Sequence, residues 1–169
     1  MQKKGFFGVT RRSDFDHRLT VLFYSSIFAP LILLFFGLGR YQRPNSYVSP
    51  YVIFPEWFVW ALAICCIGVS LFGIFLYKKR IPEAKSQVLL RWKAQRFLRA
   101  ASYKYTLSAF AGVFAAFGYY MTGESQLAIV VMGILTLFIF QRPTNKAIYK
   151  DLSLKQDEIL LFKSSQTWA

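Results

Sequence analysis

Apolar and charged positions are separated along this chain rather than interleaved. Four long segments contain no charged side chain, and each is rich in aliphatic and aromatic residues. A helix of about 20 apolar residues crosses the roughly 30 Å hydrocarbon core of a bilayer. The pattern therefore predicts an all-α integral membrane protein with four transmembrane helices, forming one transmembrane helical domain over residues 1–169. We expect the spans at about residues 19–39, 57–77, 103–122 and 126–141.

The first and fourth segments need separate arguments. The first has a longer apolar run than the roughly 7–15 residues of a signal peptide, and no small-residue cleavage site follows it before Arg40. We therefore interpret it as a span. The uncharged stretch of the fourth, residues 125–141, is 17 residues long and would extend about 25 Å as a helix. Taken alone, it is also compatible with a buried helix of a soluble protein.

The distribution of charge along the chain predicts a particular orientation in the membrane. The formal net charge is +13, which in a soluble protein would suggest nucleic acid. With four spans, however, 19 of the 21 Lys and Arg residues fall on one side, in the N-terminal tail, residues 78–104 and the C-terminal tail. The positive-inside rule then predicts that both tails are cytoplasmic, in a plasma membrane or a bacterial inner membrane. We expect anionic headgroups, and no nucleic acid, as partners of this charge.

The basic segment between the second and third spans is expected to be helical. Pro82 followed by Glu83 is typical of a helix start, and no Gly or Pro follows until Gly112, so we predict one helix from Pro82 into the third span. Its apolar residues do not form one face. The predicted partner or lipid contacts are Leu90, Trp92, Arg96 and Phe97, which fall on more than one side. A C-terminal helix around Ile159 is the internal alternative for one of these contacts.

The third span carries a ridge of small residues at spacings of four. Small side chains allow close approach of helix backbones in membranes. We predict a helix-packing role for Ser108, Gly112 and Ala116, used either inside the chain or against a partner subunit. Large aromatic residues on other spans, such as Phe35 and Phe72, are expected to face lipid or another protein.

The residues after Pro143 predict a short cytoplasmic helix. Ser153 and Gln156 are three positions apart, as in a capping box, and acidic residues then favour the first turn. The apolar residues Leu154, Ile159, Leu160 and Leu161 suggest that this helix docks on the cytoplasmic loop or on a partner.

The chain contains little that indicates catalysis or a bound cofactor. The four uncharged segments lack the ionisable residues on which proton and ion pathways usually depend. The adjacent Cys65 and Cys66 do not have metal-ligand spacing, and the single histidine, His17, has no partner cluster in the sequence. We find no nucleotide-binding or hydrolase motif. We therefore expect a protein that is not an enzyme and has no cofactor or metal.

Three functions remain open at this level. The first is an accessory or scaffold subunit of a membrane protein assembly, with possible protein partner subunits. The alternative is a small homo-oligomeric transporter or channel without membrane-embedded ionisable residues, whose path would use the hydroxyls of Ser25, Ser26, Ser70, Ser108 and Thr136. The third is an enzyme acting on lipids, which would need His17, Asp14 and Asp16 at the membrane surface.

Overall fold

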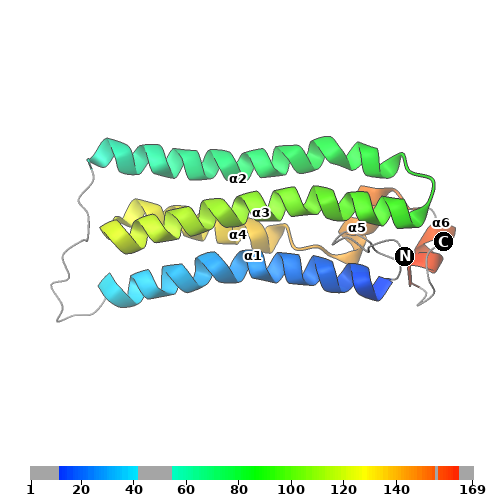
Figure 1. Cartoon of the computed structure of the whole chain (residues 1–169), viewed down its shortest axis with the longest axis horizontal. Coiled ribbons are helices and arrows are strands. Elements are labelled where there is room, and N and C mark those ends of the chain that lie inside the picture. Colours follow the sequence, from blue (N-terminus) through cyan, green and yellow to red (C-terminus); the bar gives the residue numbers. More distant parts are fainter. Residues whose placement is uncertain (1–11, 42–54, 155, 164–169) are drawn as a thin grey trace, which may run out of the picture.

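The computed structural model describes residues 12–41, 55–154 and 156–163, and these are almost entirely helical. The longer helices, α1 to α4, lie side by side, and the short helices α5 and α6 lie at one end of the bundle (Figure 1). The helices are α1 (Arg12–Tyr41), α2 (Glu56–Lys85), α3 (Leu90–Thr122), α4 (Ser125–Phe140), α5 (Asn145–Leu152) and α6 (Gln156–Lys163). The all-helical architecture predicted from the sequence is confirmed.

Helix α3 is the central element of the bundle. It packs against α1, α2 and α4, and its buried face consists largely of Ala, Gly and Ser. The turn between α2 and α3 lies at the same end of the bundle as the start of α1 and the two short helices (Figure 1). We call this end, formed by residues 12–18, 78–104, 142–154 and 156–163, the basic end, because it carries most of the cationic side chains that the structure describes.

Two helices are by themselves long and apolar enough to cross a membrane, α1 and α2, each with 30 residues. Helix α4 has only 16 residues, and it forms a pair with α5 that is bent by 77°, which would make a third, broken span. Helix α3 is long enough but less apolar, because small and hydroxylated residues replace Leu and Ile along its buried face. A membrane location is thus supported by two helices.

The prediction that Pro82 begins a helix is wrong. Helix α2 continues through Pro82 and ends at Lys85, and α3 starts separately at Leu90. The end of α2 is closed by hydrogen bonds back to its last turn: the Ser86 N–H donates to the Pro82 carbonyl at 3.1 Å. Proline removes one donor from a helix, and the carbonyl that loses its partner lies four residues earlier, at Lys78. The helix therefore tolerates Pro82 near its exposed C-terminal end.

The capping box predicted at Ser153 and Gln156 is also wrong. Ser153 instead follows the last residue of α5, a helix that the sequence pattern did not reveal, and it has a left-handed backbone with φ of 50°. Helix α5 has its own N-cap, Thr144, whose side-chain oxygen accepts a hydrogen bond from the Ala147 N–H at 3.3 Å. Helix α6 does begin at Gln156 with Asp157 and Glu158 in its first turn.

Candidate functional site

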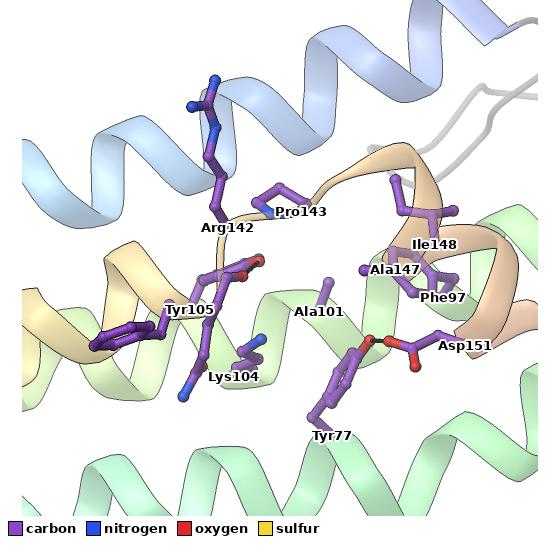
Figure 2. A pocket seen from close by; sticks show the side chains of 12 residues that line it. Tyr77, Phe97, Ala101, Lys104, Tyr105, Arg142, Pro143, Ala147, Ile148 and Asp151 are labelled. Atoms are coloured by element: carbon purple, nitrogen blue, oxygen red, sulfur yellow. Dashed lines mark hydrogen bonds between the residues drawn. The ribbon is translucent and has the colours of Figure 1, made fainter.

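A small pocket with several polar side chains lies at the basic end, where α2 and α3 meet the junction between α4 and α5 (Figure 2). The pocket has a volume of about 130 Å³ and is partly open. Its lining includes three ionisable or hydroxyl-bearing groups that face one another, Tyr77, Lys104 and Asp151, together with Tyr105 and Phe97.

A short hydrogen bond crosses this pocket. The Tyr77 hydroxyl of α2 donates to the Asp151 carboxylate of α5 at 2.5 Å. Hydrogen bonds to an ionised acceptor are shorter and stronger than those between neutral groups. This bond therefore fixes α5 against α2 across the 77° bend that separates α5 from α4.

Lys104 occupies the other side of the pocket, between two aromatic rings. Its ammonium group lies 4.9 Å from the centre of the Tyr77 ring and 5.0 Å from that of Tyr105, a cation–π arrangement. The Tyr105 hydroxyl donates to the Gln141 carbonyl at 3.0 Å and so holds the end of α4. In Figure 2 the Arg142 side chain extends away from the Tyr77–Asp151 pair. Lys104 is thus the cation closest to the rings of this site.

This arrangement is suited to holding helices together rather than to catalysis. The Tyr77 hydroxyl is hydrogen-bonded to the Asp151 carboxylate, and the Tyr105 hydroxyl is hydrogen-bonded to a backbone carbonyl. The pocket is also smaller than the roughly 300–1,000 Å³ of usual small-molecule sites. The polar cluster therefore locks the broken helix pair α4–α5 onto α2 and α3.

The structure places two of the four predicted contact residues inside the chain. Leu90 is 8% exposed and Phe97 is 3% exposed, so neither is available to lipid or to a partner, which corrects the sequence expectation. The Phe97 ring lies 5.9 Å from that of Phe15 in α1, and Phe15 in turn lies 5.5 Å from Phe162 in α6. The second apolar side of this segment is therefore covered by α1 and α6, which was the internal alternative.

An ion pair reinforces the docking of α6. The Lys93 ammonium of α3 contacts the Glu158 carboxylate at 2.5 Å, and both side chains are largely buried. Neither this pair nor the Tyr77–Asp151 bond was anticipated from the sequence. The partners are 65 and 74 positions apart, and no local spacing signals such contacts.

The other two predicted contact residues lie at the surface. Trp92 is 49% exposed, next to Val88 at 88% and Leu89 at 48%. Arg96 is paired with Glu83 at 3.7 Å, with 45% of its side chain exposed. We call Val88, Leu89 and Trp92 the apolar tip, since they occupy the turn where α2 passes into α3.

The small-residue ridge of α3 lies in the interior of the bundle. Ser108 and Ala116 are buried, and the Ser108 hydroxyl lies 3.0 Å from that of Ser70 in α2. At Gly112, an added Cβ would lie only 3.0 Å from the Cβ of Pro30 in α1. This ridge therefore brings α3 close to α1 and α2 within the chain.

Two of the residues that a lipid enzyme would need lie at the start of α1. Asp16 forms an ion pair with Arg12 at 3.0 Å on the same helix, and His17 is exposed. Within the described ranges, no group of three or more His, Cys, Asp and Glu side chains is arranged to hold a metal ion.

No protein-family model, curated protein or solved structure matches this chain.

Proposed function

We propose that this chain is a four-span accessory or scaffold subunit of a membrane protein assembly, with its basic end in the cytoplasm and no enzymatic activity of its own. Large apolar side chains on the outer faces of α1 and α2 support the membrane part of the proposal. Phe35 is 75% exposed, Trp57 70% and Ile64 67%. Such exposure is costly in water but favourable against lipid tails.

Tyrosines support a membrane position for α1, α2 and α3. Tyr41, Tyr119 and Tyr120 cluster where α1 and α3 end, and the Tyr41 hydroxyl donates to the Tyr120 carbonyl at 3.1 Å. Tyr77, Tyr103 and Tyr105 lie toward the opposite end. Tyrosine is enriched at both membrane interfaces, where its ring is apolar and its hydroxyl meets polar groups. Between Tyr105 and Tyr119, α3 carries no charged residue.

The apolar tip is the observation that carries the accessory role. Helix α3 begins at Leu90, 13 residues before Tyr103, which corresponds to roughly 20 Å of helix beyond the interface. The headgroup layer on one side of a bilayer is only about 5–8 Å thick. Lipid therefore cannot cover Val88 and Trp92 while the bundle spans the membrane, whereas the surface of a partner protein can cover them.

The charges around the apolar tip indicate what kind of partner would fit. Lys85 precedes it and Arg96 follows it in the sequence, and both are exposed, while Arg91 lies between Leu89 and Trp92 in the chain. A partner segment that combines apolar residues with carboxylates would bury the Trp92 ring and complement these cations. We therefore propose an acidic, amphipathic segment of another subunit as the occupant.

The transporter alternative has less support from the bundle. The five hydroxyl groups that a polar path would use all have partners inside the chain. Ser25 and Ser26 donate to the Leu22 carbonyl, Thr136 donates to the Met132 carbonyl, and Ser70 pairs with Ser108. A groove of about 280 Å³ between α1 and α3 lies beside Ser25 and Ser26, but its lining is mostly apolar.

Purification in mild detergent followed by native mass measurement tests the proposal. We expect a stoichiometric heteromeric complex that is lost in Val88→Glu with Trp92→Glu and kept in the control Leu160→Glu. Leu160 is 65% exposed on α6 and does not belong to the tip. A homo-oligomer that conducts a solute in liposomes would contradict the proposal, as would a heteromer that survives the tip substitutions. Leu90 and Phe97 are unsuitable for this test because they are buried in the fold.

A further inference from the structure

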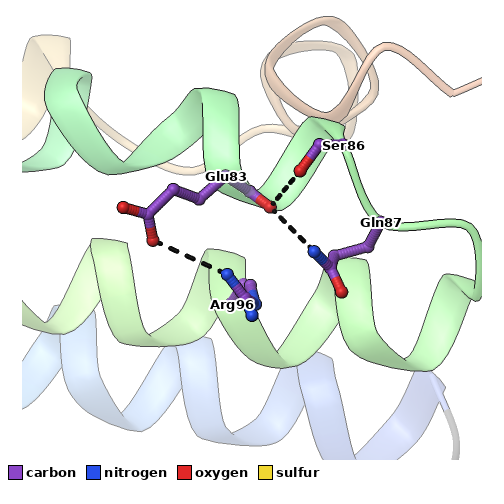
Figure 3. A network of polar contacts seen from close by, with 4 residues as sticks. All are labelled: Glu83, Ser86, Gln87 and Arg96. Carbon is purple, nitrogen blue, oxygen red and sulfur yellow. Dashed lines mark hydrogen bonds and ion pairs between the residues drawn. The ribbon is translucent and has the colours of Figure 1, made fainter.

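Three arginines converge on a second pocket at the basic end. It has a volume of about 180 Å³ and is lined by Arg80 and Glu83 of α2 and by Arg96 and Arg99 of α3. Figure 3 shows Glu83 reaching from α2 to Arg96 on α3, while the Glu83 carbonyl accepts hydrogen bonds from the side chains of Ser86 and Gln87. We call this the arginine pocket.

Aromatic and ionic contacts hold two of these arginines in position. The Arg80 guanidinium lies 4.3 Å from the centre of the Tyr103 ring of α3. Arg96 lies 3.7 Å from the Glu83 carboxylate, and both of these side chains remain substantially exposed. Stacking on an aromatic ring pre-orders a guanidinium while leaving its N–H groups available to an anion. The pocket therefore presents ordered donors to the solvent side.

The charges of the pocket favour an anion. Three guanidinium groups face one carboxylate, so the lining carries two excess positive charges. Guanidinium groups bind phosphate with paired N–H donors, and arginine is preferred over lysine where such recognition matters. The Glu83 carboxylate lies against Arg96, and Arg80 and Arg99 also line the pocket.

The depth of the pocket points to the membrane surface. Arg80 follows Tyr77 by three residues and Arg99 precedes Tyr103 by four, so both lie about 5–6 Å of helix beyond the tyrosines. With the tyrosines at the interface, this distance falls within the headgroup layer, where lipid phosphates lie. The apolar tip, in contrast, lies well beyond that layer.

We propose that the arginine pocket is a phosphate-binding site that holds the headgroup of an anionic phospholipid at the cytoplasmic leaflet. The proposal rests on the membrane placement of α2 and α3 given above, but not on the existence of a protein partner. A bound headgroup would bridge α2 and α3 beside their connecting turn and so fix the part of the chain that carries the apolar tip.

The test measures lipid retained by the full chain in a mild non-ionic detergent, by native mass measurement during titration with short-chain phosphatidylglycerol. We expect Arg80→Gln with Arg99→Gln to weaken retention about thirtyfold, since two cations near an anionic headgroup together contribute on the order of 2 kcal/mol. The matched control, Lys78→Gln with Lys79→Gln, removes the same charge from exposed neighbouring positions and should weaken it less than about twofold. Equal losses in the two double variants would overturn the site.

Two further arms keep the result interpretable. Glu83→Gln removes the one carboxylate of the pocket from an exposed side chain and should tighten retention of phosphatidylglycerol; unchanged or weaker retention would contradict the proposal. Phosphatidylcholine and inorganic phosphate are titrated in parallel. If the ligand of the pocket is an anionic lipid, phosphatidylglycerol must bind more tightly than both phosphatidylcholine and inorganic phosphate. Tighter binding of inorganic phosphate, with the same dependence on Arg80 and Arg99, would assign the pocket to a soluble phosphate compound instead. None of these arms requires a partner protein, so failure here is separate from failure of the accessory role.

Discussion

At the scale of single residues, close backbone contacts and a few long-range polar bonds determine how the helices meet. Gly112 is the clearest case, since the Cβ of Pro30 lies where a larger side chain would have to go. Gly37 is similar, because an added Cβ would lie 2.7 Å from the Tyr119 ring. These positions are sensitive to volume rather than to polarity.

Replacement of Gly112 by leucine should therefore destabilise the bundle. Overpacking of a close contact typically costs about 1–3 kcal/mol, and the rigid Pro30 ring leaves little room for relaxation. We expect a lower midpoint of thermal unfolding in detergent. The matched control is Gly68→Leu in α2, where an added Cβ meets no atom within 4 Å. If both variants melt like the parent, α3 does not approach α1 at Gly112 as closely as described.

The bond between Tyr77 and Asp151 gives a second prediction at this scale. Tyr77→Phe removes the donor and leaves a partly buried carboxylate without it, which should cost about 1–3 kcal/mol. Asp151→Asn should cost less, because an amide oxygen still accepts a hydrogen bond. Thermal unfolding of both single variants and of the double variant measures the coupling between them. Tyr24→Phe, at a position 43% exposed on α1, is the control and should leave the midpoint unchanged. Additive effects of the two substitutions would show that the pair does not hold α5.

At the scale of helices, the sequence was informative where apolar runs are long and misleading where short elements depend on tertiary contacts. The positions of α1 and α2 follow from uncharged stretches that no other structure accommodates easily. The break at residues 86–89 could not be predicted, because no Gly or Pro marks it and the proline that is present lies inside α2. Helix α5 was missed because its amphipathic surface is short and its partner, Tyr77, is 74 positions away.

The candidate sites could be predicted from the sequence where they depend on local spacing, but not where they depend on tertiary contacts. Spacing alone predicts that Ser108, Gly112 and Ala116 share one face of a helix, but it leaves open whether that face packs inside the chain or against a partner; the structure places it inside. The two apolar sides of residues 88–98 were also recognised, but which side faces the protein depends on α1 and α6. The Tyr77–Asp151 hydrogen bond and the arginine pocket both join side chains from separate helices. Only the packing register of α2 against α3 brings Arg80 near Arg99.

The end of α5 offers a prediction that belongs to this scale. Ser153 adopts φ of 50°, a left-handed conformation that costs a non-glycine residue about 1 kcal/mol or more. Ser153→Gly should therefore raise the midpoint of thermal unfolding, provided that the melting of the α5 region is part of the same transition. Ser86→Gly is the comparison, since Ser86 has an ordinary right-handed backbone with φ of −71° and should gain nothing. A lower midpoint for Ser153→Gly would argue against the left-handed helix end.

At the scale of the whole molecule, the number of spans and their orientation are the decisive properties. Two helices qualify as spans on their own, whereas α3 and α4 depend on their packing for the proposal that they also cross. Three single cysteines on a background with Cys65→Ala and Cys66→Ala separate the possibilities. Ser13→Cys and Val88→Cys lie at the basic end, and Ser125→Cys lies at the start of α4; all three positions are exposed in the structure. With four spans and a cytoplasmic basic end, an impermeant maleimide added to intact cells should label only Ser125→Cys, and inside-out vesicles should give the reverse pattern.

If only α1 and α2 cross, Ser125→Cys will instead be labelled together with Val88→Cys. If the orientation is inverted, Ser13→Cys and Val88→Cys will react in intact cells, and the arginine pocket will then face the opposite leaflet.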